Sequence, residues 1–377
     1  MSDYVRVGVI STSWWADMMH LPSLKSHPRA DVVAICGRNR DRAEEMAQKY
    51  EIPQTFTDYQ EMIARGGIQA IVIAAPDDLH YPMTMAALDA GLHVLCEKPL
   101  ALNVRQAEEM TARAEAAGVK HMALYTWRWL PYFQYLRELI EKGYLGRCYH
   151  CHFRWLAEYG RDTRYRWKWD RRRSLGTLGD LGSHMIDLAQ WYVGDIAKVS
   201  AHLSTCVEKT GLDGHPLDQV NDSAVLTIEF ENGAQGMIHV STVAHLGDSW
   251  HEQEVVLHGE SGTLEVNCRF GGGYTVRGAR HDEKHIKTLP IPEHILGDID
   301  PNSSFLDQQY RIFTERAVGD RLFIDAIVED RAVSPNFNDG LKVQKVIDAV
   351  IEADQRGCWI PLRWSGNMGE NKWRSKP

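Results

Sequence analysis

The chain has 377 residues, of which 44% are hydrophobic and 25% charged, and this length predicts two domains with separate cores. A net charge of -9, with no basic helix or polybasic tail, argues against nucleic-acid and anionic membrane partners. No apolar run approaches the roughly 20 residues of a spanning helix and no leader precedes the first strand, so we expect a cytoplasmic protein with a small-molecule substrate.

The first third of the chain alternates short apolar strands with helices. Strands are predicted at residues 5–10, 32–36, 70–75 and 93–96, and helices at 21–26, 41–50, 59–64 and 81–90. Alternation of this kind, with short connecting turns, is typical of an α/β fold with a doubly wound parallel sheet. We therefore predict an N-terminal Rossmann domain.

The turn after the first strand departs from the usual phosphate-binding fingerprint. In the register of G-x-G-x-x-G/A, residues 11–16 read Ser-Thr-Ser-Trp-Trp-Ala, and only the final alanine fits. Serines keep the side chains small and add hydroxyl donors, so the turn can still bind phosphate, although a turn that binds nothing remains an alternative. The two tryptophans could wall a cofactor cleft or a subunit contact. The candidate cofactor residues are Ser11, Thr12, Ser13, Trp14 and Trp15.

The second strand ends at Cys36 and is followed by Gly37 and Arg38, with no acidic residue before Asp41. An NAD site usually places an acid here, on the ribose hydroxyls, whereas an arginine suits the 2′-phosphate of NADP. A guanidinium can pair with that phosphate in bidentate fashion and stack on adenine. We therefore favour NADP and keep NAD possible; a solvated charge at the helix entry is the alternative for Arg38.

The strand predicted at residues 93–96 stops at Glu97-Lys98-Pro99. Proline cannot donate a ladder hydrogen bond and disfavours helix at the residue before it, so Lys98 is expected at the end of a strand. The ends of the strands border the ligand crevice in an open parallel sheet, where a lysine would face a substrate. Taken alone, Lys98 could equally be a surface residue beside a turn.

Four segments form a specific combination: His20-Leu21-Pro22, Ala75 to His80, Cys96-Glu97-Lys98-Pro99 and Leu178 to Asp187. On these residues the chain, from Arg6 to about Leu362, resembles the Gfo/Idh/MocA oxidoreductase family. Two departures are the missing glycines of the phosphate turn and Asp77, where the family commonly has asparagine.

The resemblance implies a nucleotide-binding domain, then a mixed α/β domain whose open sheet frequently forms the oligomer interface, and so a homo-oligomer such as a dimer or tetramer. It also implies hydride transfer between a nicotinamide and a secondary alcohol of a sugar, inositol or related ring. Cofactor-site residues implied by the family are Ala75, Pro76, His80, Glu97 and Lys98, and substrate-site residues are Lys98, Arg128, Trp167, Asp180 and His184.

Alternating residues in the second half predict a large, mostly antiparallel open sheet. Its strands are expected at 146–155, 198–207, 220–231, 234–243, 252–259 and 262–267, followed by a loop-rich stretch at 274–301 and helices at 305–317 and 341–356. The predicted domains are 1–125 for the nucleotide, 126–364 for substrate binding and oligomerisation, and a polar tail at 365–377.

Residues 159–174 interleave arginines and a lysine with aromatic side chains. This composition suits a sugar site, where flat rings cover C–H faces and charged donors bind hydroxyls, and it also occurs in single-stranded nucleic-acid sites. The acidic net charge favours the sugar, while a solvated loop or subunit contact accounts for most of the arginines. If several of them face the pocket, an anionic substituent is expected on the substrate.

Asp180 and His184 are four residues apart at the start of a predicted helix that runs toward Tyr192. Residues at this spacing share a helical face, so Asp180 can polarise the imidazole. Histidine is suited to accept a hydroxyl proton near neutral pH, and Lys98 can then stabilise the developing alkoxide. A single histidine would more often be structural; together, Lys98, Asp180 and His184 predict a catalytic site.

Cys148 and Cys151 have the spacing of a metal-binding pair, but their segment alternates like a strand, in which they would point to opposite faces. We expect reduced cysteines and no metal site.

The predicted function is thus an NAD(P)-dependent oxidoreductase of a sugar, glycoside or inositol-like polyol. The alternatives are a glycoside hydrolase or epimerase that retains its cofactor through transient oxidation, and a non-catalytic protein that senses a nucleotide or sugar. The serine-substituted turn argues mildly for the last, whereas the intact Lys98, Asp180 and His184 argue against it.

Overall fold

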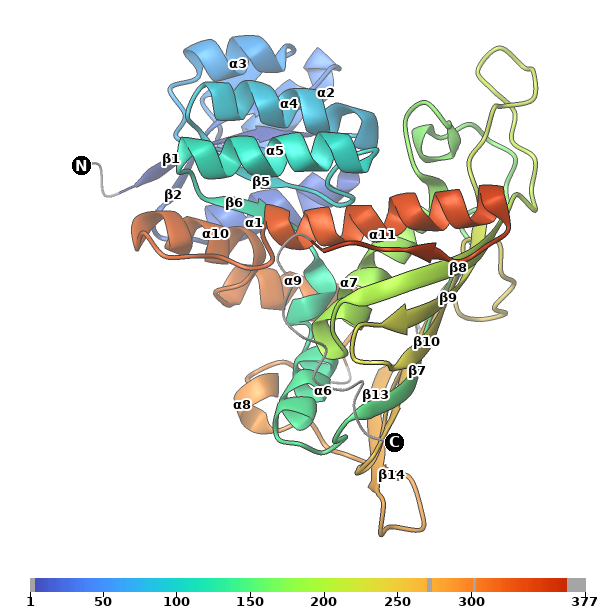
Figure 1. The fold of residues 1–377 in the computed structure, drawn as a ribbon. Coiled ribbons are helices and arrows are strands. Elements are labelled where there is room, and N and C mark those ends of the chain that lie inside the picture. Colours follow the sequence, from blue (N-terminus) through green and yellow to red (C-terminus); the bar gives the residue numbers. More distant parts are fainter. Residues whose placement is uncertain (1–3, 270–272, 301–302, 365–377) are drawn as a thin grey trace. The chain divides into compact units, whose positions relative to one another are not determined.

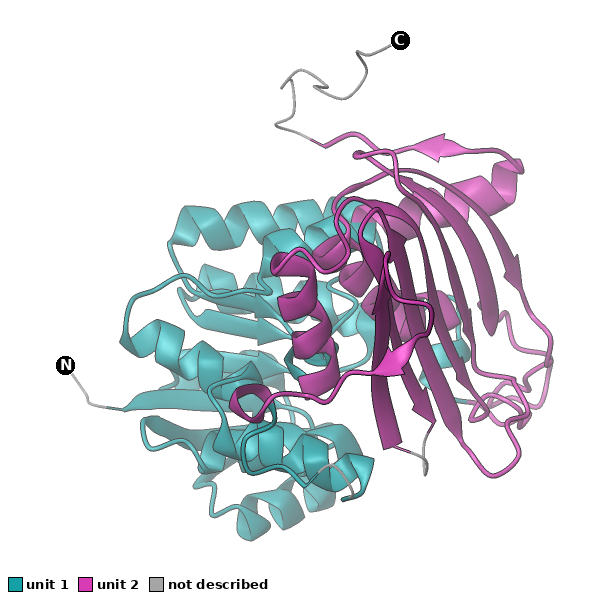
Figure 2. Cartoon of the chain, turned by 90° about the horizontal axis from the view of Figure 1, so that it is seen from below, with its two compact units in different colours: residues 1–130, 166–175, 296–344 teal, residues 131–165, 176–295, 345–377 magenta. Residues whose placement is uncertain are grey.

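The computed structural model describes residues 4–269, 273–300 and 303–364, so the predicted tail at 365–377 lies outside the described residues. The chain divides into two compact units, shown in two colours in Figure 2. Unit 1 comprises residues 1–130, 166–175 and 296–344, and unit 2 comprises 131–165, 176–295 and 345–377. The chain passes between the units several times, and the functional domains proposed above stay a prediction.

Unit 1 contains the predicted parallel sheet, in the order β3-β2-β1-β4-β5-β6. Its neighbouring strands all pair in parallel. Their residues are largely apolar and fully buried, as expected for a sheet covered on both faces. This confirms the Rossmann fold. The strands are β1 (Val5–Ile10), β2 (Ala30–Cys36), β3 (Gln54–Phe56), β4 (Ala70–Ile73), β5 (His93–Cys96) and β6 (His121–Ala123).

Helices cover this sheet, and α4 and α5 lie side by side (Figure 1). The side chains of Asn39, Asp58 and Asn103 accept backbone N–H groups at the starts of α2, α3 and α5, as N-caps do. No helix in the described ranges is long and apolar enough to cross a membrane. The helices of the nucleotide fold are α1 (Leu21–Lys25), α2 (Arg40–Lys49), α3 (Tyr59–Arg65), α4 (Asp77–Asp89) and α5 (Val104–Ala117).

The C-terminal part of the chain returns to unit 1 with α9 (Phe305–Glu315) and α10 (Gly319–Val328). Both helices pack against α1, and α9 also contacts η1 (Ala16–His20), a π-helical turn that follows the serine-containing turn. Helix α10 was not predicted from the sequence. Its return to η1 matters for the candidate site, because it carries Asp320 at its first turn.

Unit 2 is built on a broad sheet in the order β14-β13-β12-β11-β7-β10-β9-β8-β15, seen as one layer in Figure 2. Strands β7 and β10 pair in parallel, and the other neighbours pair antiparallel, which confirms a mostly antiparallel sheet. Its strands include β7 (Cys148–Ala157), β8 (Ile196–Ser204), β9 (Ser223–Phe230), β10 (Gln235–Ser241), β11 (His251–Gly259) and β12 (Gly262–Arg269).

The expectation of a loop-rich stretch at 274–301 was wrong in part, because β13 (Gly273–Arg280), the two-residue β14 (Lys287–Thr288) and α8 (Glu293–Leu296) lie there. Strand β13 buries little beyond Val276, so it lacks the apolar alternation that identifies a strand in a sequence. Helices α6 (Pro131–Glu141) and α7 (Ser183–Tyr192), the helix α11 (Phe337–Arg356) and the short strand β15 (Ile360–Pro361) complete the main elements.

A bulge changes the orientation predicted for Cys148 and Cys151. The pairing of β7 with β11 shifts so that His258 faces His150 while Gly259 faces Cys148, which leaves one extra residue on β7. Both cysteines are therefore buried, and their thiols contact each other, against the expectation of opposite faces. Within the described ranges, no group of three or more His, Cys, Asp or Glu side chains could hold a metal ion.

Gly176 fixes the backbone that enters η4 (Leu178–Gly182), the π-helical turn that carries Asp180. Its φ is +67°, and an added Cβ atom would lie 2.4 Å from the carbonyl oxygen of Asn221. Asn221 also anchors the turn, since its carbonyl accepts the Thr177 N–H at 3.0 Å and its side chain accepts the Leu178 N–H at 2.9 Å.

We expect Gly176→Ala to destabilise the protein by about 2 to 3 kcal/mol, because it combines a positive φ with a steric overlap. Gly233→Ala is the matched control: Gly233 has a φ of +85° with no atom within 4 Å of an added Cβ. The control should lose only about 1 kcal/mol. Urea midpoints measure both, and equal losses would show that the Asn221 contact does not constrain the turn.

Candidate functional site

The serines of the predicted phosphate turn hold its shape through their side chains. The Ser13 N–H donates to Ser11 Oγ at 3.1 Å, and the Ala16 N–H donates to Ser13 Oγ at 3.2 Å. The Ser11 hydroxyl is 2.9 Å from Ser13 Oγ. These contacts supply, by hydrogen bonds, some of the order that glycines supply through backbone freedom in the usual fingerprint. They bring Ser11 and Ser13 together as one small cluster at the start of η1.

The end of β2 lies directly against this turn. An added Cβ atom at Gly37 would be 2.4 Å from Thr12 Cγ2, so a longer side chain at position 37 would crowd Thr12. Arg38 is exposed, and in the described part of the chain its guanidinium has no ion-pair partner. Its neighbour Arg40 instead lies 3.5 Å from Glu44. Thr12 and Arg38 thus belong to the same edge of the parallel sheet.

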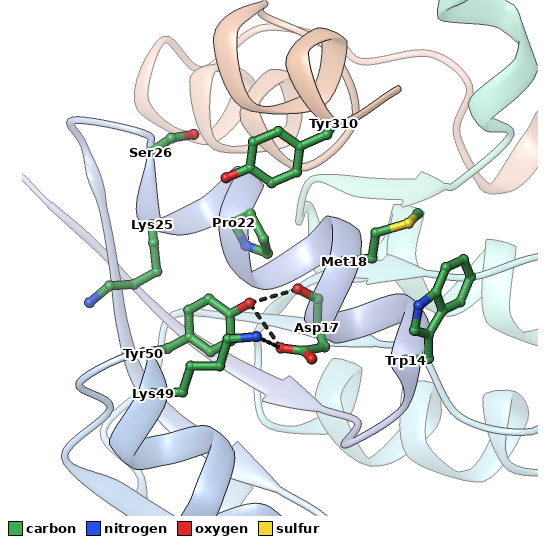
Figure 3. Close-up of a pocket in the computed structure, with 9 residues that line it drawn as sticks. All are labelled: Trp14, Asp17, Met18, Pro22, Lys25, Ser26, Lys49, Tyr50 and Tyr310. Carbon is green, nitrogen blue, oxygen red and sulfur yellow. Dashed lines mark hydrogen bonds and ion pairs between the residues drawn. The ribbon is translucent and has the colours of Figure 1, made fainter. Parts of the chain in front are cut away.

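A surface cavity of about 670 Å³ lies beside the turn, and Figure 3 shows the residues that line it. Lys49 and Tyr50 converge on Asp17, whose carboxylate accepts hydrogen bonds from Lys49 Nζ at 2.6 Å and from the Tyr50 hydroxyl at 2.9 Å. Burial would raise the pKa of Asp17, but these bonds lower it below its ordinary value. Of the predicted cofactor residues, only Trp14 lines this cavity.

A buried histidine holds the backbone that follows Lys98. His80, on α4, is 1% exposed; its Nδ1 lies 2.8 Å from the Pro99 carbonyl oxygen and its Nε2 lies 2.9 Å from the Ala75 carbonyl oxygen. Because both partners only accept, both ring nitrogens must carry protons. Burial alone would lower the pKa of His80, but Cys96, Asp77 and the Pro99 carbonyl raise it to about 10. Ala75, Pro76 and His80, predicted from the family resemblance, therefore lie together with the end of β5.

A second buried histidine holds the residue that precedes Lys98. His20 Nε2 is 3.2 Å from Glu97 Oε1, and His20 Nδ1 is 2.9 Å and 3.1 Å from the two oxygens of Asp320. The Trp15 indole N–H donates to Glu97 Oε1 at 2.6 Å, and the Lys98 N–H donates to Glu97 Oε2 at 3.1 Å. Sequence reasoning missed Asp320, because 300 residues separate it from His20 and no local motif marks it.

The charges of this cluster support one another. Burial alone would lower the pKa of His20, but Asp320 and Glu97 raise it to about 10. Burial alone would raise the pKa of Glu97, whereas His20, Lys98 and Trp15 lower it below its ordinary value. His20 is therefore an imidazolium between two carboxylates at neutral pH.

Asp180 and His184 belong to unit 2, where they lie on η4 and on the first turn of α7. Asp180 Oδ2 accepts a hydrogen bond from the Tyr159 hydroxyl at 2.6 Å, a partner that the sequence did not reveal. The ring of His184, which is 5% exposed, lies 5.7 Å from the ring of Trp155 on β7. Burial lowers the pKa of the neighbouring His251 to about 4, so that ring is neutral at pH 7.

The basic stretch at 159–174 is largely tied to the protein. Carboxylates hold three of its arginines: Arg164 pairs with Asp162, Arg172 with Asp170 and Arg173 with Asp78. Arg128, predicted to bind substrate, is 8% exposed and lies 3.2 Å from Asp339 and 3.3 Å from Ser334 Oγ. Trp167 lies in the short helix η3 (Trp167–Trp169) and is partly exposed, unlike the buried Trp169.

Comparison with known proteins agrees with this architecture. The description "Oxidoreductase family, NAD-binding Rossmann fold" matches residues 5–125, and "GFO/IDH/MocA C-terminal domain" matches residues 133–265. A D-glucoside 3-dehydrogenase of Escherichia coli is 30% identical over 96% of this chain and 98% of its own length. The chain belongs to the Gfo/Idh/MocA oxidoreductase family. The resemblance stated from the sequence is thus confirmed, and the protein is an oxidoreductase with an NAD-binding domain.

Two further members of the family are similar over most of their length. A levoglucosan dehydrogenase of Pseudarthrobacter phenanthrenivorans is 27% identical over 87% of this chain and 88% of the relative. The solved structure of a levoglucosan dehydrogenase in complex with NADH and levoglucosan has a TM-score of 0.84 at 25% identity, covering 95% of this chain and 99% of that one.

The raised pKa of His20 predicts a pH dependence of stability. The contribution of the imidazolium to the free energy of unfolding is complete below the ordinary pKa of 6.5 and is lost as the pH rises through about 10. Between these values the folded chain keeps a proton that the unfolded chain has released, so a rising pH favours the unfolded chain. We expect the urea midpoint to fall between pH 6.5 and 10, and His20→Gln to flatten part of this slope. The remainder should come from His80, which titrates in the same window. An equal slope in His20→Gln would show that the imidazolium does not stabilise the fold.

Proposed function

We propose that the protein is an NAD(P)-dependent dehydrogenase that oxidises a secondary hydroxyl of a neutral sugar or glycoside, or catalyses the reverse reduction. The observation that carries this proposal is Lys98, held at the end of β5 by buried contacts on both sides, in the position where parallel sheets meet their ligands. The named activities of the relatives, on levoglucosan and at the 3-position of glucosides, support a pyranoside as the substrate class. The pairing of Arg164, Arg172 and Arg173 with carboxylates favours a neutral one.

The residues around the first turn fit a nicotinamide dinucleotide. Thr12, Ser13 and Trp15 lie in the turn that carries the pyrophosphate in Rossmann domains. No acidic residue stands between Cys36 and Asp41 to bind the ribose hydroxyls of NAD, and the exposed guanidinium of Arg38 suits a 2′-phosphate. NADP is therefore the favoured cofactor and NAD the alternative. When bound, the nicotinamide supplies the hydride acceptor or donor.

We assign the general base, which accepts the proton of the substrate hydroxyl, to His184 and not to Lys98. A lysine needs a large downward shift of its pKa to accept a proton at neutral pH, whereas a histidine needs almost none. Lys98 instead donates a hydrogen bond to the reacting oxygen and stabilises the charge that develops there. Asp180, fixed by the Tyr159 hydroxyl, orients the imidazole of His184.

Turnover tests this assignment. Protein, NADP or NAD, and a panel containing levoglucosan, methyl glucoside, glucose, glucose 6-phosphate and inositol should give a change in nicotinamide absorbance. Lys98→Ala and His184→Ala should each lower kcat by roughly 100-fold or more. Lys142→Ala, which removes an exposed lysine paired with Glu138, is the control and should keep full activity.

Other outcomes separate the alternatives. Unchanged turnover in both Lys98→Ala and His184→Ala would reject their catalytic roles. A modified sugar without accumulated reduced cofactor would indicate the hydrolase or epimerase that retains its nucleotide. If calorimetric titration detected no binding of NADP or of NAD, that result would contradict both the dehydrogenase and the cofactor-retaining hydrolase or epimerase.

Arg38→Ala tests the cofactor preference. Loss of charge-assisted hydrogen bonds to the 2′-phosphate should raise the Kd for NADP roughly 10-fold to 100-fold, with a change below about threefold for NAD. Arg40→Ala is the matched control, because this arginine is two residues away and pairs with Glu44. Calorimetric titration measures both constants, and an equal effect of Arg38→Ala on the two nucleotides would contradict a 2′-phosphate contact.

A further inference from the structure

The end of β5 is connected to helix α10 by an uninterrupted chain of buried hydrogen bonds. Asp320, at the first turn of α10, contacts His20 at the end of η1, and His20 contacts Glu97 directly before Lys98. His20 and Asp320 are both 0% exposed, and Glu97 is 8% exposed. The family resemblance assigned no role to Asp320.

Each oxygen of Glu97 has a defined partner in this arrangement. Oε1 accepts both the Trp15 indole N–H and the Nε2–H of His20, while Oε2 accepts the backbone N–H of Lys98. The cation that hydrogen-bonds Glu97 Oε1 is therefore the imidazolium. A buried carboxylate without such a partner would attract the nearest ammonium strongly, because Coulomb interactions are large where water is excluded.

The protonation of His20 depends on having an acceptor on both sides. With Asp320 at Nδ1 and Glu97 at Nε2, a neutral imidazole would place one lone pair against a carboxylate. The charged groups that face the ring are Asp320 from α10 and Glu97 from the end of β5. Asp17, on the same turn as His20, faces Lys49 and Arg42 instead.

We propose that Asp320 and His20 are positioning residues for Lys98: they keep an imidazolium on Glu97, which fixes that carboxylate and directs the neighbouring ammonium to the substrate. The inference rests on the role of Lys98 in the proposed function. The indole N–H of Trp15, from the predicted cofactor turn, donates a hydrogen bond to Glu97 Oε1 as well. The arrangement therefore connects that turn to the segment that carries Lys98.

The test uses Asp320→Asn with a matched control on the same helix. Asp325 holds His27 Nε2 at 3.0 Å, and the ring of His27 is likewise buried, but the pair has no contact with Glu97. Both variants replace an aspartate of α10 that pairs with a buried histidine. A purely structural role would therefore affect them alike.

The expected result is a ratio of kcat, variant to wild type, that depends on pH only for Asp320→Asn. An amide at position 320 lets His20 lose its proton at lower pH, so the ratio should be near one at pH 6 and fall roughly tenfold by pH 9. His20→Gln should show the low kcat at every pH, with the KM for the nucleotide changed less than twofold. A ratio independent of pH in Asp320→Asn, as in Asp325→Asn, would overturn the proposal.

A second readout does not depend on turnover. In NMR spectra of protein with ¹³C-methylated lysines, the Lys98 signal can be assigned by its loss in Lys98→Arg. In Asp320→Asn this signal should shift with pH, and the midpoint of the shift should equal the midpoint at which the His20 ring loses its proton. In wild type and Asp325→Asn it should not move between pH 6 and 9. An inactive wild-type protein that shows this coupling would contradict the proposed function and support the positioning, whereas a Lys98 signal insensitive to His20 would overturn the positioning.

If Asp320→Asn does not fold, Glu97→Gln in active enzyme decides: an unchanged kcat would overturn the proposal.

Discussion

The structure of unit 1 depends on a buried imidazolium placed between two carboxylates. Removing three charged groups from water is costly, and the arrangement is stable only because each charge has a hydrogen-bonded partner of opposite sign. His20, Glu97 and Asp320 come from η1, the end of β5 and α10. The return of residues 296–344 to the nucleotide fold is therefore more than packing, since without α10 the imidazole would face a single carboxylate.

The main elements could be predicted because their signals are local. Parallel strands buried on both faces read as apolar runs, and the half-exposed strands of unit 2 alternate, so both sheets were recognised from the sequence. The elements that were missed lack such signals. Strand β3 has three residues, β13 buries little apolar surface, and α10 begins at Gly319, whose φ of +54° gives no conventional helix start. The bulge at Tyr149 arises from pairing with β11 and cannot be read from β7 alone.

The candidate site shows the same limit. Glu97, Lys98, Asp180 and His184 stand out as short motifs, whereas the groups that hold them are distant in the chain. Asp320 and Tyr159 had no signal beyond their residue types, because the contacts that define them form only in the folded protein. The serine turn was a departure from a motif in the sequence, and the structure shows how side-chain hydrogen bonds support it.

Six ionisable groups at and near the end of β5 balance one another in charge. Asp77, Glu97 and Asp320 supply three carboxylates, and His20, His80 and Lys98 supply three cations. Because these carboxylates and cations balance, an alkoxide that develops beside the Lys98 ammonium in the proposed reaction adds a negative charge to a set of groups that is neutral before the reaction. In the proposed reaction the ammonium therefore stabilises a charge that is present in the transition state and absent from the ground state. Under the proposed mechanism, that difference, and not tight binding of the substrate, lowers the barrier to reaction.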